Sequence, residues 1–149
     1  MILDKNLRYC SEQAITSAAA SEDVLDMANL TYLAEGKPVY LVLDVTETFD
    51  DTGDDSTLTV SLEGATDAAF TTVAEADDLF TLDALTADDS KIISYPLGNN
   101  VGALNANSAF TRLKFTPTNG DLSAGKITAY LSDVPVGQFI AHKTNIEIK

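Results

Sequence analysis

Residues 39–45 of the chain read VYLVLDV, and the apolar side chains in this stretch occupy every second position: Val39, Leu41, Leu43 and Val45. A period of two is that of a β-strand with one face buried. Tyr40, Val42 and Asp44 are therefore expected on the opposite face. The stretch predicts a strand in an antiparallel sheet whose apolar side faces a core.

The same alternation recurs further along the chain. It is present in residues 57–62, 112–116 and 127–132, and residues 91–97 form a further candidate strand. Within that strand Pro96 is expected at an edge or outside the ladder, because proline has no N–H to donate. Turn-rich segments separate the strands: DDTGDD, EGATDAA, GNNVGALNANS, PTNGDLSAG and DVPVG. This arrangement predicts an all-β sandwich or barrel in a single domain.

Two segments are ambiguous. Residues 11–29, which are rich in Ala and Ser, are compatible with a short helix or an extended arm, and the lack of a long apolar stripe favours the arm. Residues 73–89 carry leucines at helical spacing, but apolar residues also alternate there, so a short strand and a single helical turn both remain open. We therefore expect an N-terminal arm over residues 1–30 and a β domain over residues 31–149.

The chain is strongly acidic. It has 149 residues, with 23 Asp and Glu against 9 Lys and Arg, and a formal net charge of −14. This charge repels phosphate backbones and anionic lipids, so no binding to nucleic acid or to a membrane is expected. No apolar run reaches the roughly 20 residues of a membrane-spanning helix, and residues 1–16 lack the pattern of a signal peptide. We expect a soluble chain that is not exported by a signal peptide.

Cys10 and His142 are the single cysteine and the single histidine of the chain. One cysteine excludes an internal disulfide and a cysteine-based zinc cage within one chain, which fits a reducing compartment. Cys10 is expected to be a small apolar residue in a packed or interface segment. With no Gly-x-Ser-x-Gly elbow, a catalytic His142 is not expected. The sequence therefore predicts no enzyme, no cofactor and no metal site.

The acidic stretch DDTGDD at residues 50–55 invites a comparison with calcium loops. Counted from Asp50, however, Asp55 stands where such a loop has its glycine, and Ser61 stands where it has its bidentate glutamate. A hydrated hairpin turn with Gly53 at positive φ is favoured over a structural cation site. The acidic clusters at residues 75–78 and 88–89 resemble the paired carboxylates of glycosidases, but solvated loops are the favoured interpretation.

Several segments, taken together and in order, resemble one protein family. They read MILDKNLRYCSEQAIT (1–16), SAAASEDVLD (17–26), STLTVSLEGATDAAFT (56–71) and FTRLKFTPTNGDLSAGKITAYLSD (110–133). Together they are similar to the capsid cement, or decoration, proteins of tailed bacteriophages related to the Bordetella phage cement protein.

The resemblance implies a fold and a role. The fold would be a jelly-roll-like antiparallel β-sandwich with an extended N-terminal arm. The protein would lie on the outer surface of the virion capsid. The protein would be assembled in the cytoplasm of the bacterial host, bind the major capsid protein, bridge its neighbouring subunits, and self-associate as a homodimer or homotrimer. We expect the arm to become ordered on its partner through six residues: Leu3, Leu7, Arg8, Tyr9, Ile15 and Val24.

Two other functions remain as alternatives. A carbohydrate-binding β-sandwich is suggested by the acidic loops, as candidate calcium sites, and by four tyrosines that would offer stacking surfaces: Tyr32, Tyr40, Tyr95 and Tyr130. The absence of Trp argues against it. A small glycoside hydrolase would need a deep cleft with paired carboxylates, which is hard to build in a chain of this size.

Overall fold

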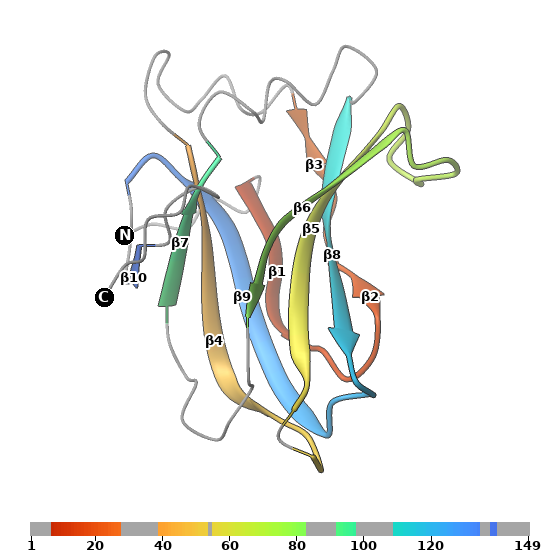
Figure 1. The fold of residues 1–149 in the computed structure, drawn as a ribbon. Helices are drawn as coiled ribbons and strands as arrows, with labels where there is room; N and C mark the ends of the chain where they lie inside the picture. Colours follow the sequence, from red (N-terminus) through yellow and green to blue (C-terminus); the bar gives the residue numbers. More distant parts are fainter. Residues whose placement is uncertain are drawn as a thin grey trace.

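The computed structural model describes residues 7–27, 39–53, 55–82, 92–97, 109–134 and 138–139. The elements in these residues are all β-strands, and they form two sheets that pack face to face (Figure 1). The strands expected around residues 39–45, 57–62, 112–116 and 127–132 are all present. The predicted all-β sandwich is therefore confirmed.

Each sheet is assembled from strands that lie far apart in the sequence. Sheet A contains β1 (Arg8–Ala14), β4 (Tyr40–Asp50), β7 (Ile92–Pro96), β9 (Ala124–Ser132) and β10 (Gln138–Phe139). Sheet B contains β2 (Ala19–Ala20), β3 (Leu25–Asp26), β5 (Thr57–Ala65), β6 (Glu75–Leu82) and β8 (Phe110–Thr118).

The strand order identifies the sandwich as a jelly roll. Sheet A has the order β1-β9-β4-β7-β10, and sheet B has the order β2-β8-β5-β6, with β3 also paired to β8. When β2 and β3 are taken as one interrupted strand and β10 as an addition at an edge, each sheet has four strands. The chain passes to the other sheet after most strands, as in a double-sheet jelly roll. The pairing is antiparallel except between β7 and β10.

The core lies between the two sheets and is apolar. Leu41 and Leu43 of β4 face it, as the alternation predicts, and Leu58 and Val60 of β5 face it from the other sheet. The largest fully buried side chains include Tyr9, Phe49 and Phe115. Removing a large apolar side chain from water contributes about 1.5–3 kcal/mol, so these residues supply much of the drive to fold.

The outer side of sheet A departs from the alternation. The alternation of residues 39–45 and 127–132 places Val42 and Tyr130 on the outer side, yet their relative exposures are only 0% and 6%. Val42 lies opposite both Tyr130 and Ser94 in the sheet, and Ser94 is also buried. This row of side chains is therefore not a free surface. On the outer side of sheet B, Thr57 and Thr59 stay partly exposed, as the alternation of residues 57–62 predicts, whereas Ser61, predicted to face outward with them, is buried.

Residues 7–27 belong to the sandwich, so the prediction of a free N-terminal arm is wrong over this range. β1 pairs with β9 in sheet A, and β2 and β3 both pair with β8 in sheet B. The sequence pattern does not predict β1, because the strand has two register shifts and Glu12 has a φ of 49°. These irregularities break the alternation of apolar residues that is typical of a strand. Residues 1–6 and the predicted domain boundary at residue 30 lie outside the described residues.

A polar contact across the core ties this segment to both sheets. The Tyr9 hydroxyl, from β1, lies 2.9 Å from the Oγ1 atom of Thr111, from β8. The Thr111 hydroxyl also lies 3.4 Å from the Sδ atom of Met27. Because Tyr9 is completely buried, its hydroxyl would destabilise the folded chain if it had no hydrogen-bond partner. The backbone N–H of Asp23 donates to the Tyr9 carbonyl at 2.8 Å and fixes the other end of the residue.

The other ambiguous segment forms a strand where the structure describes it. β6 covers residues 75–82 and lies at the edge of sheet B, beside β5. Residues 83–91 lie outside the described range. Pro96 is the last residue of β7 and lies opposite Tyr40 in the ladder with β4, so it is not outside the ladder, although β10 pairs only with Ile93 and Ser94 on the other side.

A close contact between a glycine and a ring positions β9 against β4. Gly125 has a φ of 139°, and a Cβ added to it would lie 2.8 Å from the Cγ atom of Phe49. Phe49 is completely buried and has no room to move away. Glycine is therefore required at position 125 both for its backbone conformation and for the approach of the ring.

We expect Gly125→Ala to destabilise the fold more than Gly120→Ala. Gly120 has a φ of 112°, but nothing lies within 4 Å of a Cβ added there, so its cost is backbone strain alone, about 1–3 kcal/mol. At Gly125 the overlap with Phe49 adds about 1–3 kcal/mol to a similar strain. Urea unfolding of both variants measures the difference in the free energy of unfolding. Equal losses would show that the Phe49 contact does not constrain β9.

Tyr9→Phe should lower the free energy of unfolding by about 1 kcal/mol, because it removes the hydroxyl that bridges the two sheets. A double-mutant cycle with Thr111→Val separates this contact from the rest of the Tyr9 ring, whose packing the phenylalanine preserves. A coupling energy of zero between the two positions would contradict the bridging role.

Candidate interaction surfaces

The six residues predicted to bind a partner fall into three groups. Leu3 lies outside the described residues. Leu7, Tyr9 and Ile15 are buried in the core of the chain itself, so the prediction that they are available to a partner is wrong. Their side chains pack in the core of the chain itself, and the irregular alternation of β1 did not predict this packing. Arg8 and Val24 are partly exposed, and their role in binding stays a prediction.

Arg8 has an unused hydrogen-bond donor. It lies opposite Tyr130 in sheet A, and its Nε atom is buried with no hydrogen-bond partner among the described residues. A guanidinium group presents its donors in a fork that matches a carboxylate. Arg8 is therefore chemically suited to contact an acidic group, but its Nε atom is covered by other atoms in the folded chain.

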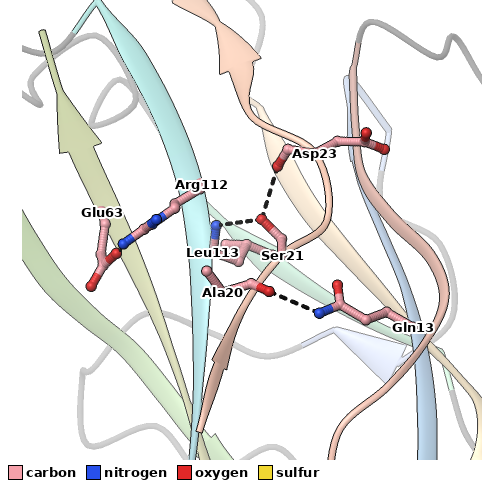
Figure 2. A network of polar contacts seen from close by, with 7 residues as sticks. All are labelled: Gln13, Ala20, Ser21, Asp23, Glu63, Arg112 and Leu113. Atoms are coloured by element: carbon pink, nitrogen blue, oxygen red, sulfur yellow. Dashed lines mark hydrogen bonds and ion pairs between the residues drawn. The ribbon is translucent and has the colours of Figure 1, made fainter. Parts of the chain in front are cut away.

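Side-chain hydrogen bonds supplement the backbone pairing where the chain passes from β2 to β3 (Figure 2). The Ser21 hydroxyl accepts a hydrogen bond from the Leu113 N–H at 3.1 Å and donates to the Asp23 carbonyl at 3.0 Å. From β1, the Gln13 side-chain N–H donates to the Ala20 carbonyl at 2.8 Å. Side chains thus supply partners that a continuous strand would supply from its backbone. The segment predicted as an arm is held to both sheets by these contacts.

The outer side of sheet B is polar. The hydroxyls of Thr59 and Thr81, on neighbouring strands, lie 3.1 Å apart, and the Ser61 hydroxyl donates to the Asp78 carboxylate at 2.6 Å. Cross-strand pairs of this kind contribute about 0.2–1 kcal/mol each. They order the sheet surface without creating an apolar patch on it.

An arginine holds the connection between β5 and β6, residues 66–74, which we call the β5–β6 loop. The guanidinium carbon of Arg112, in β8, lies 4.3 Å from the centre of the Phe70 ring. Its Nε donates to the Glu63 carboxylate of β5 at 2.7 Å, and Figure 2 shows this pair on adjacent strands. Sequence reasoning did not single out this cluster, because Glu63 and Arg112 meet only once β5 and β8 are in register.

The acidic turn at residues 50–55 is not the hairpin that the sequence predicts. It joins β4 and β5, which lie in different sheets, and Gly53 does not have the expected positive φ. A Cβ on Gly53 would instead lie 2.7 Å from a carboxylate oxygen of Asp55. Asp51 is buried and accepts a hydrogen bond from the Ser56 hydroxyl at 2.6 Å. Within the described ranges, no three acidic, His or Cys side chains are placed to hold a metal ion.

The groups considered for catalysis are not assembled into a site in the part of the chain that the structure describes. Asp77 and Asp78 are exposed on the edge strand β6, while residues 88–89 and His142 lie outside the described ranges.

No helix that is long and apolar enough to cross a bilayer is present in the described residues.

The tyrosines considered for carbohydrate stacking do not form an exposed platform. Tyr95 and Tyr130 are buried, and the Tyr95 ring stacks on Phe80 inside the sandwich at a centroid distance of 5.2 Å. Tyr40 is partly exposed, and Tyr32 lies outside the described residues. Two of the four rings are therefore inaccessible to a sugar.

Cys10 is buried in β1, and its thiol donates to the Ile127 carbonyl at 3.5 Å. Burial raises the pKa of the Cys10 thiol to about 12, from an ordinary value of 9.0. Burial likewise raises the pKa of the neighbouring Tyr9 hydroxyl. Because the thiolate is the reactive form of cysteine, Cys10 is unreactive in the folded chain and acts as a packed apolar residue.

The strand order defines the class of the protein: a double-sheet jelly roll, an architecture that occurs in viral capsid and lectin domains. A family model, Bbp16, matches residues 9–131, which span the sandwich from β1 to β9. The chain belongs to the Bbp16 family, a family of Bordetella phage proteins. This confirms the relation to phage proteins that the sequence predicted. A search of curated proteins found no match.

The chain should lose stability at alkaline pH. Well below pH 9 the Cys10 thiol is neutral in both the folded and the unfolded chain, so the free energy of unfolding does not change with pH through this group. Between pH 9 and about 12 the unfolded thiol ionises while the folded thiol does not, and ionisation favours the unfolded state. The expected loss is up to about 1.4 kcal/mol per pH unit, measured by urea unfolding at a series of pH values.

Cys10→Ala is the matched variant, because it removes the thiol while keeping a small apolar side chain. Its free energy of unfolding should fall less steeply with pH above pH 9 than that of the parent chain. Identical slopes would mean that the thiol is not shielded in the folded state. Tyr9 contributes in the same direction in both chains, since its pKa is also raised, so it does not affect the comparison.

Proposed function

We propose that the chain is a structural cement protein that binds the outer surface of a tailed-phage capsid and bridges neighbouring subunits of the major capsid protein. Membership of a phage protein family across nearly the whole sandwich is the observation that carries this proposal. The segments that resemble cement proteins include β1, β5, β8 and β9, which are paired with one another in the two sheets. In this role the chain needs no catalytic group.

The architecture supports a role in bridging. The strands within residues 7–27 are paired to β8 and β9, so this described segment is part of the sandwich and not a loose arm. A rigid scaffold that carries loops at its ends can hold two partners at a fixed separation. Self-association as a homodimer or homotrimer, which we include in the proposal, would multiply the contacts with the shell and strengthen attachment by avidity.

The net charge favours the outer surface over the inner one. A chain with a formal charge of −14 would be repelled by packaged DNA inside a capsid. On the outer surface the chain is separated from the packaged DNA by the shell, and salt screens the repulsion between them. Charges separated by more than about 10 Å interact weakly at ordinary salt concentrations.

Quantitative mass spectrometry of purified phage particles tests the proposal. We expect the ratio of this chain to the major capsid protein to be one or a simple fraction, because a cement protein occupies repeated positions on the shell. In addition, shells lacking the chain should open at a lower temperature than shells to which purified chain has been added back.

An unrelated acidic protein of similar size serves as the control in the add-back measurement, since it tests whether charge alone stabilises shells. Absence of the chain from particles, or stabilisation equal to that of the control protein, would refute the cement role. Binding to a glycan in place of shells would then support the carbohydrate-binding alternative.

A further inference from the structure

Exposed large apolar side chains are rare on the described surface, and one of them lies in the β5–β6 loop. Among the described residues, Val73 and Val134 are the large hydrophobic residues that are exposed, at 38% and 52%. Val73 belongs to the β5–β6 loop, where Ala68 and Ala69 are also exposed. In Figure 1 this loop extends from the ends of β5 and β6 beyond the sandwich, away from sheet A.

The loop is held in one conformation at an energetic cost. Phe70 has a φ of 50°, and a left-handed backbone at a bulky residue costs about 1–3 kcal/mol unless its surroundings enforce it. Here the Phe70 ring is buried under the guanidinium of Arg112, and Arg112 is itself paired with Glu63. The Phe70 N–H donates to the Asp67 carbonyl at 3.1 Å, which closes the turn. The loop is therefore preorganised, and the exposed side chains around it are presented in a fixed geometry.

The surroundings of the loop are acidic. Asp67 lies within it, and β6, which follows it, begins with Glu75 and continues with the exposed Asp77 and Asp78. The cation nearest the loop, Arg112, is already paired with Glu63. The exposed surface of this region thus combines small apolar side chains with the acidic side chains of Asp67, Asp77 and Asp78.

The other described surfaces are less suited to docking. On the outer side of sheet A, Val42 and Tyr130 are buried within the chain. At the opposite end of the sandwich, the turn between β4 and β5 exposes Thr52 and Asp55 and no large apolar side chain. The backbone of β6 is an edge, but its acidic side chains are of the kind that discourage pairing with a further strand.

We propose that the β5–β6 loop is the docking element of the protein, and that it inserts its apolar side chains into a shallow apolar patch on a shell subunit, rimmed by Lys or Arg. This inference rests on the proposed cement function, and it names the part of the chain that makes the contact. The fixed loop keeps the entropic cost of docking low, and the acidic surroundings attract a basic rim and raise the association rate.

Binding of purified chain to shells that lack it tests the inference, with Val73→Lys compared with Val134→Lys. Both variants place the same charged group at an exposed valine, so folding should be preserved in each, which melting temperatures will check. Lysine at position 73 would be driven into the apolar patch and against its basic rim, so we expect binding to weaken by at least roughly tenfold. Val134→Lys should stay within about twofold of the parent chain, and the affinity of the parent chain should fall as salt is raised.

The outcomes separate the two proposals. If the parent chain binds shells and Val73→Lys binds equally well, or if Val134→Lys is weakened as much as Val73→Lys, the loop is not the docking element and the cement function stands. If the affinity of the parent chain does not change with salt, the apolar patch on the shell subunit is not rimmed by Lys or Arg. If the parent chain does not bind shells, the proposed function fails, and the inference fails with it.

Discussion

The pairing of β1 with β9 is the constraint on which the rest of the structure depends. The Cys10 thiol contacts the carbonyl of Ile127, a residue 117 positions further along the chain. This pairing places Tyr9 in the core, where its hydroxyl reaches sheet B, and it brings β2 and β3 alongside β8. Closing so long a loop costs entropy that is recovered only when both sheets are packed. The jelly roll is therefore expected to form cooperatively and not by the successive addition of local hairpins.

Strands with one buried and one open side were predictable from the sequence. β8 keeps a regular alternation from Phe110 to Thr116, and β5 does so from Thr57 to Val60, because inner side chains there face the core and outer ones are partly exposed. β1 was not predictable, since its register shifts displace the apolar residues from the expected spacing. β2 and β3 have two residues each, too few to show any period. The burial of Val42 on the outer side of sheet A depends on tertiary packing, which alternation does not report.

The candidate site was less predictable than the fold. The partner-binding residues proposed in the N-terminal segment rested on the assumption that an irregular apolar pattern means a free arm, whereas Ile15 and Leu7 belong to the core. The β5–β6 loop was not predictable as an interaction surface from its own sequence. Its sequence shows a turn that contains an aromatic residue, but the left-handed conformation of Phe70 and its contact with Arg112 come from strands that are distant in the sequence.

The position of the β5–β6 loop also determines how the domain bears mechanical load. A force on the loop that acts along the strand direction would be carried by β5 and β6, which leave it side by side in the same sheet (Figure 1). β5 is hydrogen-bonded along its whole length to β8 on its other side, so the pull slides one strand past the other and does not peel them apart. Sliding requires the hydrogen bonds of the β5–β8 ladder to break together, whereas peeling breaks them one at a time. The mechanically resistant direction of the β5–β8 ladder therefore runs along the strand that leads into the loop.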